Sequence, residues 1–213
     1  MTKEQVRERI LEIKIVPVVR ASSPAQALGA AEAVRAGGIP IVEVTMTVPG
    51  AIDVIAALSR SMGKDVTIGA GTVLDAATAQ KCLDAGAQFI VSPGYDAETV
   101  ALARREGVLV MPGSLTPTEV INSWKAGADF VKIFPAGNVG GPAYIKSLKA
   151  ALPQIPMIPT GGVNLETAAA FLKAGAAALG IGGELIAKAA LESGNFAAIT
   201  ESARQYCAIV KQP

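Results

Sequence analysis

The 213-residue chain contains no histidine. This absence excludes a Ser-His-Asp triad, a Cys-His pair and any metal site built on imidazole. Any acid–base chemistry must therefore be performed by Glu, Asp, Lys, Tyr or water.

Cysteine, aromatic residues and net charge are also scarce. The two cysteines, Cys82 and Cys207, lie far apart, and we expect reduced, buried thiols. Aromatic residues make up 4% of the chain, so its 51% hydrophobic content must build a core from Ala, Val, Ile and Leu. A net charge of +1 without a basic run gives no reason to expect a nucleic-acid or membrane partner. The polar first residues do not resemble a signal peptide, and no apolar run is long enough to span a membrane, so we expect a cytoplasmic protein.

A repeated pattern runs through the chain. Helical segments end in Ala-Gly at positions 36–37, 85–86, 126–127 and 174–175, and each is followed by a short apolar strand. Including the units without this signature, the pattern predicts strands at 15–19, 41–45, 66–70, 88–92, 108–111, around Lys132, 157–160 and 177–181. Eight βα units favour a single-domain (β/α)₈ TIM barrel over residues 1–213, with an extra N-terminal helix at 1–13. An open flavodoxin-like sheet is the alternative, but it needs only five strands.

Lys132 stands out because it occupies a strand of otherwise apolar residues. Side chains alternate along a strand, so Phe130, Lys132 and Phe134 share one face. A desolvated lysine tends to lose its proton, and the free amine forms Schiff bases with carbonyl groups. The alternative is a lysine whose stem packs while its ammonium group reaches water.

Glu43 is the second candidate for chemistry. In the strand 41–45, Val42 and Val44 suit the helix-facing side, so Glu43 points into the barrel. A buried carboxyl group near Lys132 can move the protons that Schiff-base formation requires. The alternative is a structural ion pair with an Arg or Lys of the barrel.

Two glycine pairs end the last two predicted strands. Gly161-Gly162 follows strand 157–160, and Gly182-Gly183 follows strand 177–181. The loops after strands seven and eight are a common phosphate site of barrels, where glycine exposes backbone N–H groups and a helix N-terminus adds a favourable dipole. Two tight turns without a ligand are the alternative.

Other residues at predicted strand ends are candidates for substrate binding. Arg20 can pair with a carboxylate or phosphate, although an ion pair with Glu43 is equally consistent with its position. Thr72 and Thr160 offer hydroxyl groups, with capping or turn roles as the alternative. Phe134 and Pro93 would form an apolar wall.

Six segments in succession resemble the motifs of one family. These segments are Val42-Glu43-Val44-Thr45, Gly69-Ala70-Gly71-Thr72-Val73, Val91-Ser92-Pro93-Gly94, Met111-Pro112-Gly113, Val131-Lys132-Ile133-Phe134-Pro135 and Pro159-Thr160-Gly161-Gly162-Val163. In this order they resemble the 2-keto-3-deoxy-6-phosphogluconate (KDPG) and 4-hydroxy-2-oxoglutarate (KHG) aldolases. The resemblance implies a (β/α)₈ barrel, a homotrimer, and class I aldol chemistry on a small keto acid without a metal or other cofactor.

The resemblance also implies roles for individual residues. It gives the Schiff base to Lys132 and the proton shuttle to Glu43. The residues expected around the substrate are Arg20, Thr72, Pro93, Phe134 and Thr160, with the phosphate held by Gly161, Gly162, Gly182 and Gly183. Two positions depart from the family pattern: Thr47 stands where many members have Arg, and Gly183 where many have Ser.

The expected reaction is therefore cleavage of KDPG to pyruvate and glyceraldehyde 3-phosphate. Its C4 epimer, 2-keto-3-deoxy-6-phosphogalactonate, and KHG remain open as substrates, because motifs do not reveal stereochemistry. A phosphosugar isomerase or epimerase that uses Glu43 as its base is an alternative, as is a catalytically silent phosphosugar-binding barrel.

Overall fold

The structure is a computed structural model that describes residues 1–211. The strands are β1 (Ile15–Val19), β2 (Ile41–Thr45), β3 (Thr67–Gly71), β4 (Phe89–Val91), β5 (Leu109–Met111), β6 (Gly113–Ser114), β7 (Val131–Ile133), β8 (Met157–Pro159) and β9 (Leu179–Ile181). The helices are α1 (Lys3–Ile13), α2 (Pro24–Ala36), α3 (Ala51–Met62), α4 (Ala76–Asp84), α5 (Ala97–Arg105), α6 (Pro117–Lys125), η1 (Gly137–Val139), α7 (Pro142–Ala151), α8 (Ala168–Lys173), α9 (Lys188–Ser193) and α10 (Phe196–Val210). No helix within these 211 residues has the length and apolar character needed to cross a membrane.

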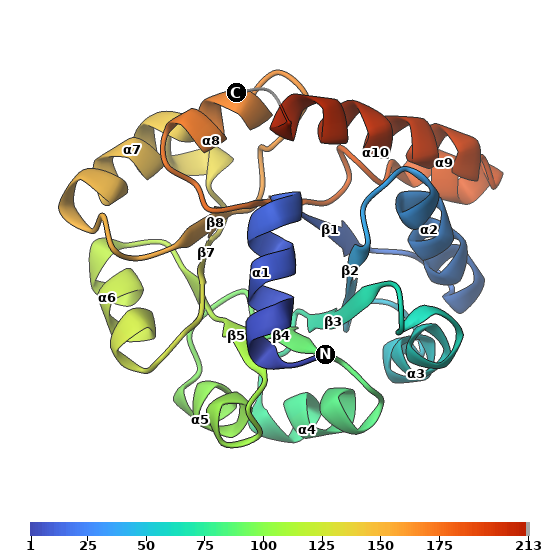
Figure 1. Cartoon of the computed structure of the whole chain (residues 1–213), viewed down its shortest axis with the longest axis horizontal. Helices are drawn as coiled ribbons and strands as arrows, with labels where there is room; N and C mark the ends of the chain where they lie inside the picture. Colours follow the sequence, from blue (N-terminus) through green and yellow to red (C-terminus); the bar gives the residue numbers. More distant parts are fainter. Residues whose placement is uncertain (212–213) are drawn as a thin grey trace.

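The strands form a curled, parallel α/β fold. One sheet has the order β5-β4-β3-β2-β1-β9 and the other β6-β7-β8, and the pairs within both are parallel. A single parallel bridge between Thr160 and Gly180 connects the end of β8 with β9. Figure 1 shows the strands curling around a common centre, with the labelled helices other than α1 outside them. This arrangement confirms the parallel α/β class and brings the carboxyl ends of the strands to one end of the fold.

The fifth strand continues beyond its predicted end at Met111, and it is divided in two in the structure. Its first part, β5, pairs with β4, whereas its second part, β6, pairs with β7. Pro112 stands between the two parts, and proline has no N–H to donate to a ladder. Its carbonyl still accepts a hydrogen bond from the Lys132 backbone N–H at 3.0 Å. The two sheets therefore adjoin at Pro112, immediately beside the strand that carries Lys132.

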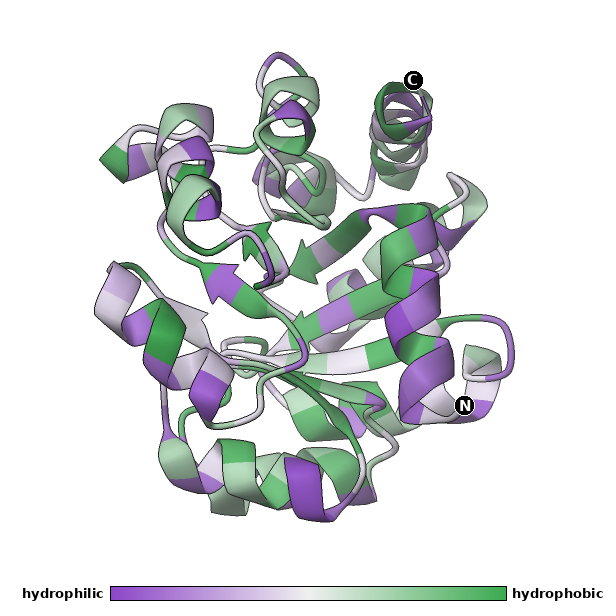
Figure 2. Ribbon diagram, turned by 60° about the vertical axis from the view of Figure 1, so that its left-hand side comes forward, coloured by the Kyte–Doolittle hydropathy of each residue, from purple (hydrophilic) through white to green (hydrophobic). Residues whose placement is uncertain are grey.

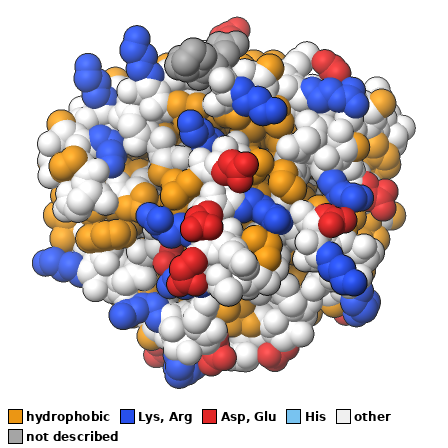
Figure 3. Space-filling model, viewed as in Figure 1, with side chains coloured by type: hydrophobic (Ala, Val, Ile, Leu, Met, Phe, Trp, Pro, Cys, Tyr) orange, Lys and Arg blue, Asp and Glu red, His pale blue; other side chains and the backbone are white. Residues whose placement is uncertain are grey.

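The N-terminal helix α1 lies across one end of the fold (Figure 1). Thr2 and Gln5 form the capping box that starts it. Val6 and Ile10 are buried, and Lys3 forms an ion pair with Asp129 at 2.8 Å. Figure 3 shows acidic and basic side chains interspersed on the face that carries α1, which agrees with the small net charge. The carboxyl end of the strands, opposite α1, remains for a site.

The apolar core is built by the strands together with the inward faces of the helices. Figure 2 shows hydrophobic residues along the strands and mixed polarity on the helices. Polar side chains buried on or beside strands are the exception, and they are Glu43, Thr45, Thr67, Ser92, Ser114, Lys132 and Thr160. Burying a polar group without a hydrogen-bond or charge partner is costly, so these positions are candidates for a role other than packing.

Candidate active site

Lys132 and Glu43 meet inside the curled sheet, although 88 residues lie between them in the sequence. Lys132 lies on β7 and Glu43 on β2. Their side chains are only 4% and 3% exposed, and the Lys132 Nζ lies 3.9 Å from the Glu43 Oε1. The predicted encounter of amine and carboxyl group is therefore present. Such a pair can hold an amine against a carbonyl group while a carboxyl group moves protons.

The electrostatic environment of Glu43 suits proton transfer. Burial raises the pKa of the Glu43 carboxyl group above its ordinary value of 4.5, while the positive charges of Lys132 and Arg20 partly oppose that rise. Within residues 1–211 the Glu43 Oε1 atom is buried and has no hydrogen-bond partner. A carboxyl group with a raised pKa and a free oxygen can both accept and return a proton.

Gly71 determines where the Glu43 carboxyl group lies. A Cβ atom on Gly71 would lie only 1.9 Å from the Glu43 Oε1 and 2.5 Å from its Cδ. The carboxyl group therefore occupies the space that any larger residue at position 71 would fill. We did not predict this contact, although the Gly69-Ala70-Gly71-Thr72 motif contained its signal, a glycine at a strand end.

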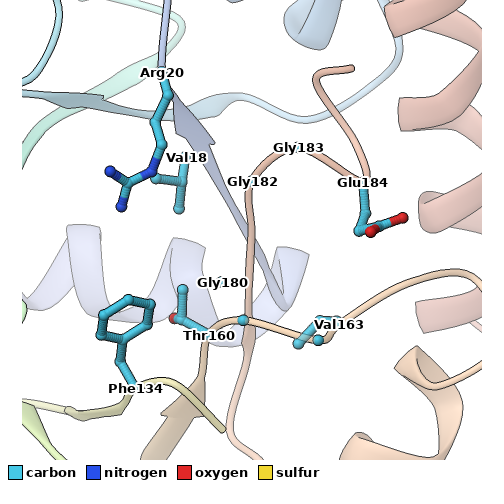
Figure 4. A pocket seen from close by; sticks show the side chains of 11 residues that line it. Val18, Arg20, Phe134, Thr160, Val163, Gly180, Gly182, Gly183 and Glu184 are labelled. Atoms are coloured by element: carbon cyan, nitrogen blue, oxygen red, sulfur yellow. The ribbon is translucent and has the colours of Figure 1, made fainter. Parts of the chain in front are cut away.

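Phe134 forms a wall beside the amine. The Lys132 Nζ lies 5.4 Å from the centre of the Phe134 ring, within the range of a cation–π interaction. Phe134 also lines a cavity of about 230 Å³ that extends away from this pair. The other predicted site residues that line this cavity are Arg20, Thr160, Gly161, Gly162, Gly182 and Gly183. Figure 4 shows the Arg20 guanidinium group and the Phe134 ring on the same side of the cavity. Most of the predicted substrate-binding residues are thus brought together.

Pro93 and Thr72 lie in other parts of the site. Pro93 lines a neighbouring cavity of about 380 Å³, which Phe134 also lines, so Phe134 has one cavity on each side. Thr72 follows Gly71 with a φ of 57°, a left-handed conformation that a β-branched residue rarely adopts. Such strain is concentrated at functional sites, and Thr72 adjoins the glycine that faces Glu43.

The two glycine turns line the far end of the cavity. Gly161 and Gly162 have φ values of 85° and 76°, and a Cβ atom on Gly162 would lie 2.7 Å from the Gly137 Cα. Larger residues are therefore strained at this turn. The expected helix N-terminus does not follow directly. Helix α8 begins only at Ala168 and α9 at Lys188, because a separate turn intervenes after each glycine pair.

Four residues that line the cavity were not among those predicted, namely Val18, Val163, Gly180 and Glu184, and Glu184 is the charged one. Glu184, directly after Gly182-Gly183, lines the cavity and is exposed. An isolated acidic residue in a loop gives no functional signal in the sequence, because most such residues are simply solvated.

Comparisons with known proteins agree with this geometry. The family model described as "KDPG and KHG aldolase" matches residues 6–202. A 2-dehydro-3-deoxy-phosphogluconate aldolase of Treponema pallidum is 35% identical over 204 residues, which are 95% of this chain and 96% of the relative. A 2-dehydro-3-deoxy-6-phosphogalactonate aldolase of Escherichia coli is 36% identical over 175 residues, 82% of this chain and 85% of the relative.

A solved structure extends the likeness to the fold. The KDPG aldolase of Legionella pneumophila, with pyruvate captured as a covalent carbinolamine intermediate, has a TM-score of 0.84 and 29% identity. The match covers 93% of this chain and 96% of that one. The length of the family match and the identity to relatives over nearly the whole chain lead to one conclusion: this chain belongs to the KDPG and KHG aldolase family.

Proposed function

We propose that this chain is a class I aldolase that cleaves 2-keto-3-deoxy-6-phosphogluconate to pyruvate and glyceraldehyde 3-phosphate. The observation that carries the proposal is the buried Lys132 amine, 3.9 Å from the Glu43 carboxyl group. The names of the Treponema pallidum and Legionella pneumophila relatives support the substrate. The Escherichia coli relative gives the C4-epimeric phosphogalactonate as a second candidate.

In the proposed mechanism the Lys132 amine attacks the C2 ketone of the substrate. The resulting carbinolamine loses water to form an iminium ion. Glu43 takes the proton of the C4 hydroxyl group, the C3–C4 bond breaks, and the iminium ion accepts the electron pair as an enamine. Protonation at C3 and hydrolysis then release pyruvate and the free amine. The raised pKa of Glu43 suits these transfers, because its carboxyl group must both accept and donate protons.

The surrounding residues would hold the substrate. We assign the substrate carboxylate to the neighbourhood of Arg20, Thr72 and Thr160, and the apolar walls to Pro93 and Phe134. The distal end of the substrate would lie in the cavity lined by Gly161, Gly162, Gly182 and Gly183. The volume of about 230 Å³ and the shared lining by Phe134 support this placement.

The same proposal includes the architecture. We infer that the two sheets together form one closed (β/α)₈ barrel in a single domain. The parallel bridge between Thr160 and Gly180 supports closure between β8 and β9. Residues 212–213 of the predicted domain lie outside the described residues. A homotrimer follows from the family resemblance alone, and light scattering of the purified protein would test it.

Pyruvate release tests the proposed function directly. Purified protein is incubated with KDPG, its C4 epimer or KHG, and pyruvate is measured by coupled reduction to lactate. We expect release with the native protein and a loss of at least about a thousandfold in Lys132→Met, because the nucleophile is absent. Lys146→Met, which removes an exposed lysine of α7, is the matched control and should retain activity. Near-normal turnover by Lys132→Met would refute the mechanism.

A further inference from the structure

The cavity beyond Lys132 carries one charge of each sign. Among the described residues that line it, Arg20 is the single cation and Glu184 the single anion. Figure 4 shows Arg20 and Glu184 on opposite sides of the cavity, with the Gly182-Gly183 turn between them. The Glu184 carboxylate therefore comes directly after the Gly182-Gly183 turn, where we place the distal end of the substrate.

Arg20 lies towards the reacting end of the site. Its positive charge reaches Glu43, where it opposes the rise in pKa that burial causes. Glu43 in turn lies 3.9 Å from the Lys132 amine. The single cation of the cavity is thus within electrostatic reach of the reacting pair, where the carboxylate of a keto acid would bind. No lysine or arginine among the described lining residues remains for a second anion at the distal end.

The distal end also lacks a directly adjoining helix N-terminus. Helix α8 begins six residues beyond Gly162, and α9 begins five residues beyond Gly183. The field of a helix falls off within its first turn, so neither helix compensates for the Glu184 charge. What remains at this end is glycine backbone, the apolar Val163 side chain and one carboxylate. Carboxylate oxygens accept hydrogen bonds from hydroxyl groups, whereas a like-charged phosphate dianion is repelled.

We propose that Glu184 determines substrate choice at the distal end, so that the enzyme also cleaves the unphosphorylated 2-keto-3-deoxy sugar acid. This inference rests on the proposed aldolase function and extends it to a second substrate class. Breaking the C3–C4 bond of 2-keto-3-deoxygluconate gives pyruvate and glyceraldehyde, with Lys132 and Glu43 acting as on the phosphorylated compound. The electron pair passes to the iminium ion and the C4 hydroxyl proton to Glu43, so no further reactant is required.

The test compares kcat/KM for 2-keto-3-deoxy-6-phosphogluconate with that for 2-keto-3-deoxygluconate. In the native enzyme we expect the phosphorylated compound to be favoured by no more than about tenfold. In Glu184→Gln that preference should rise about tenfold, through the phosphorylated substrate alone, because only its dianion is repelled. Since Glu184 is exposed, 1 M salt should reduce the difference between the two enzymes.

Glu166→Gln is the matched control. Glu166 is exposed in the loop after Gly161-Gly162 but does not line the cavity. Glu166→Gln changes the net charge of the protein by the same amount as Glu184→Gln. We expect its substrate preference to equal that of the native enzyme. A preference in Glu184→Gln that stays within about twofold of the native value, or a native preference above about a thousandfold, would overturn the inference.

Failure of this inference is distinguishable from failure of the proposed function. If both substrates release pyruvate through Lys132 but their ratio does not respond to Glu184→Gln, only the role of Glu184 is wrong. If neither substrate releases pyruvate and pyruvate does not bind covalently to Lys132, the aldolase function itself is wrong, and the inference fails with it.

Discussion

Replacing Gly71 with alanine should disable Glu43 while both reacting residues, Lys132 and Glu43, are retained. The added Cβ atom would lie 1.9 Å from the Glu43 Oε1, whereas ordinary contacts begin at 3.4 Å. The carboxyl group must therefore move by about 1.5 Å. Displacements of about 1 Å from the productive geometry can cost about a hundredfold in rate. We expect Gly71→Ala to lower kcat for pyruvate release by at least that factor.

Gly69→Ala is the matched control for this experiment. It places the same methyl group on the same strand, but its Cβ atom would meet the Phe89 ring, at 2.1 Å, instead of Glu43. Both variants should lose stability, so kcat is normalised to the folded fraction measured by circular dichroism. Only Gly71→Ala should show the large kcat defect, while covalent pyruvate binding to Lys132 persists. A Gly71→Ala enzyme within about threefold of native kcat would show that the Glu43 position is not critical.

Two further predictions concern pH and packing. Because burial raises the pKa of Glu43 in the folded state, the folded protein binds more protons than the unfolded chain above pH 4.5, and the contribution of this group to stability falls as pH rises. Urea unfolding between pH 4 and 8 should therefore show the free energy of unfolding of the native protein decreasing relative to that of Glu43→Gln; a constant difference would contradict the raised pKa. Phe89 is fully buried against Gly69, so its replacement by alanine should lower the free energy of unfolding by about 3–5 kcal/mol, measured by the same method. A decrease below about 1 kcal/mol would contradict its packing role.

The local repeat made the fold class predictable. Helix ends marked by Ala-Gly and short apolar strands indicate βα units one at a time, because these signals lie within each unit. The division of the sheet was not predictable in the same way. Pro112 interrupts the fifth strand, but which strands its two halves join depends on neighbours that are distant in sequence.

The candidate site shows the same contrast. Lys132 and Glu43 were recognisable because a charged residue on an apolar strand is costly and therefore informative. The contact between Gly71 and the Glu43 carboxyl group depends on the register of β2 with β3, which pairs Thr45 with Gly71. Glu184 has an ordinary sequence context, and only the folded chain brings it to the cavity that Arg20 lines. Features that depend on long-range packing were thus beyond sequence reasoning.

Covalent trapping of pyruvate tests the proposed chemistry most directly. The folded protein is incubated with pyruvate and sodium borohydride, digested, and analysed by mass spectrometry, with Lys132→Met and Lys146→Met treated in parallel. We predict a reduced pyruvyl adduct on Lys132, retained in Lys146→Met and absent from Lys132→Met. A folded native protein that forms no adduct, or forms it on another lysine, would contradict the assignment of Lys132 as the Schiff-base residue.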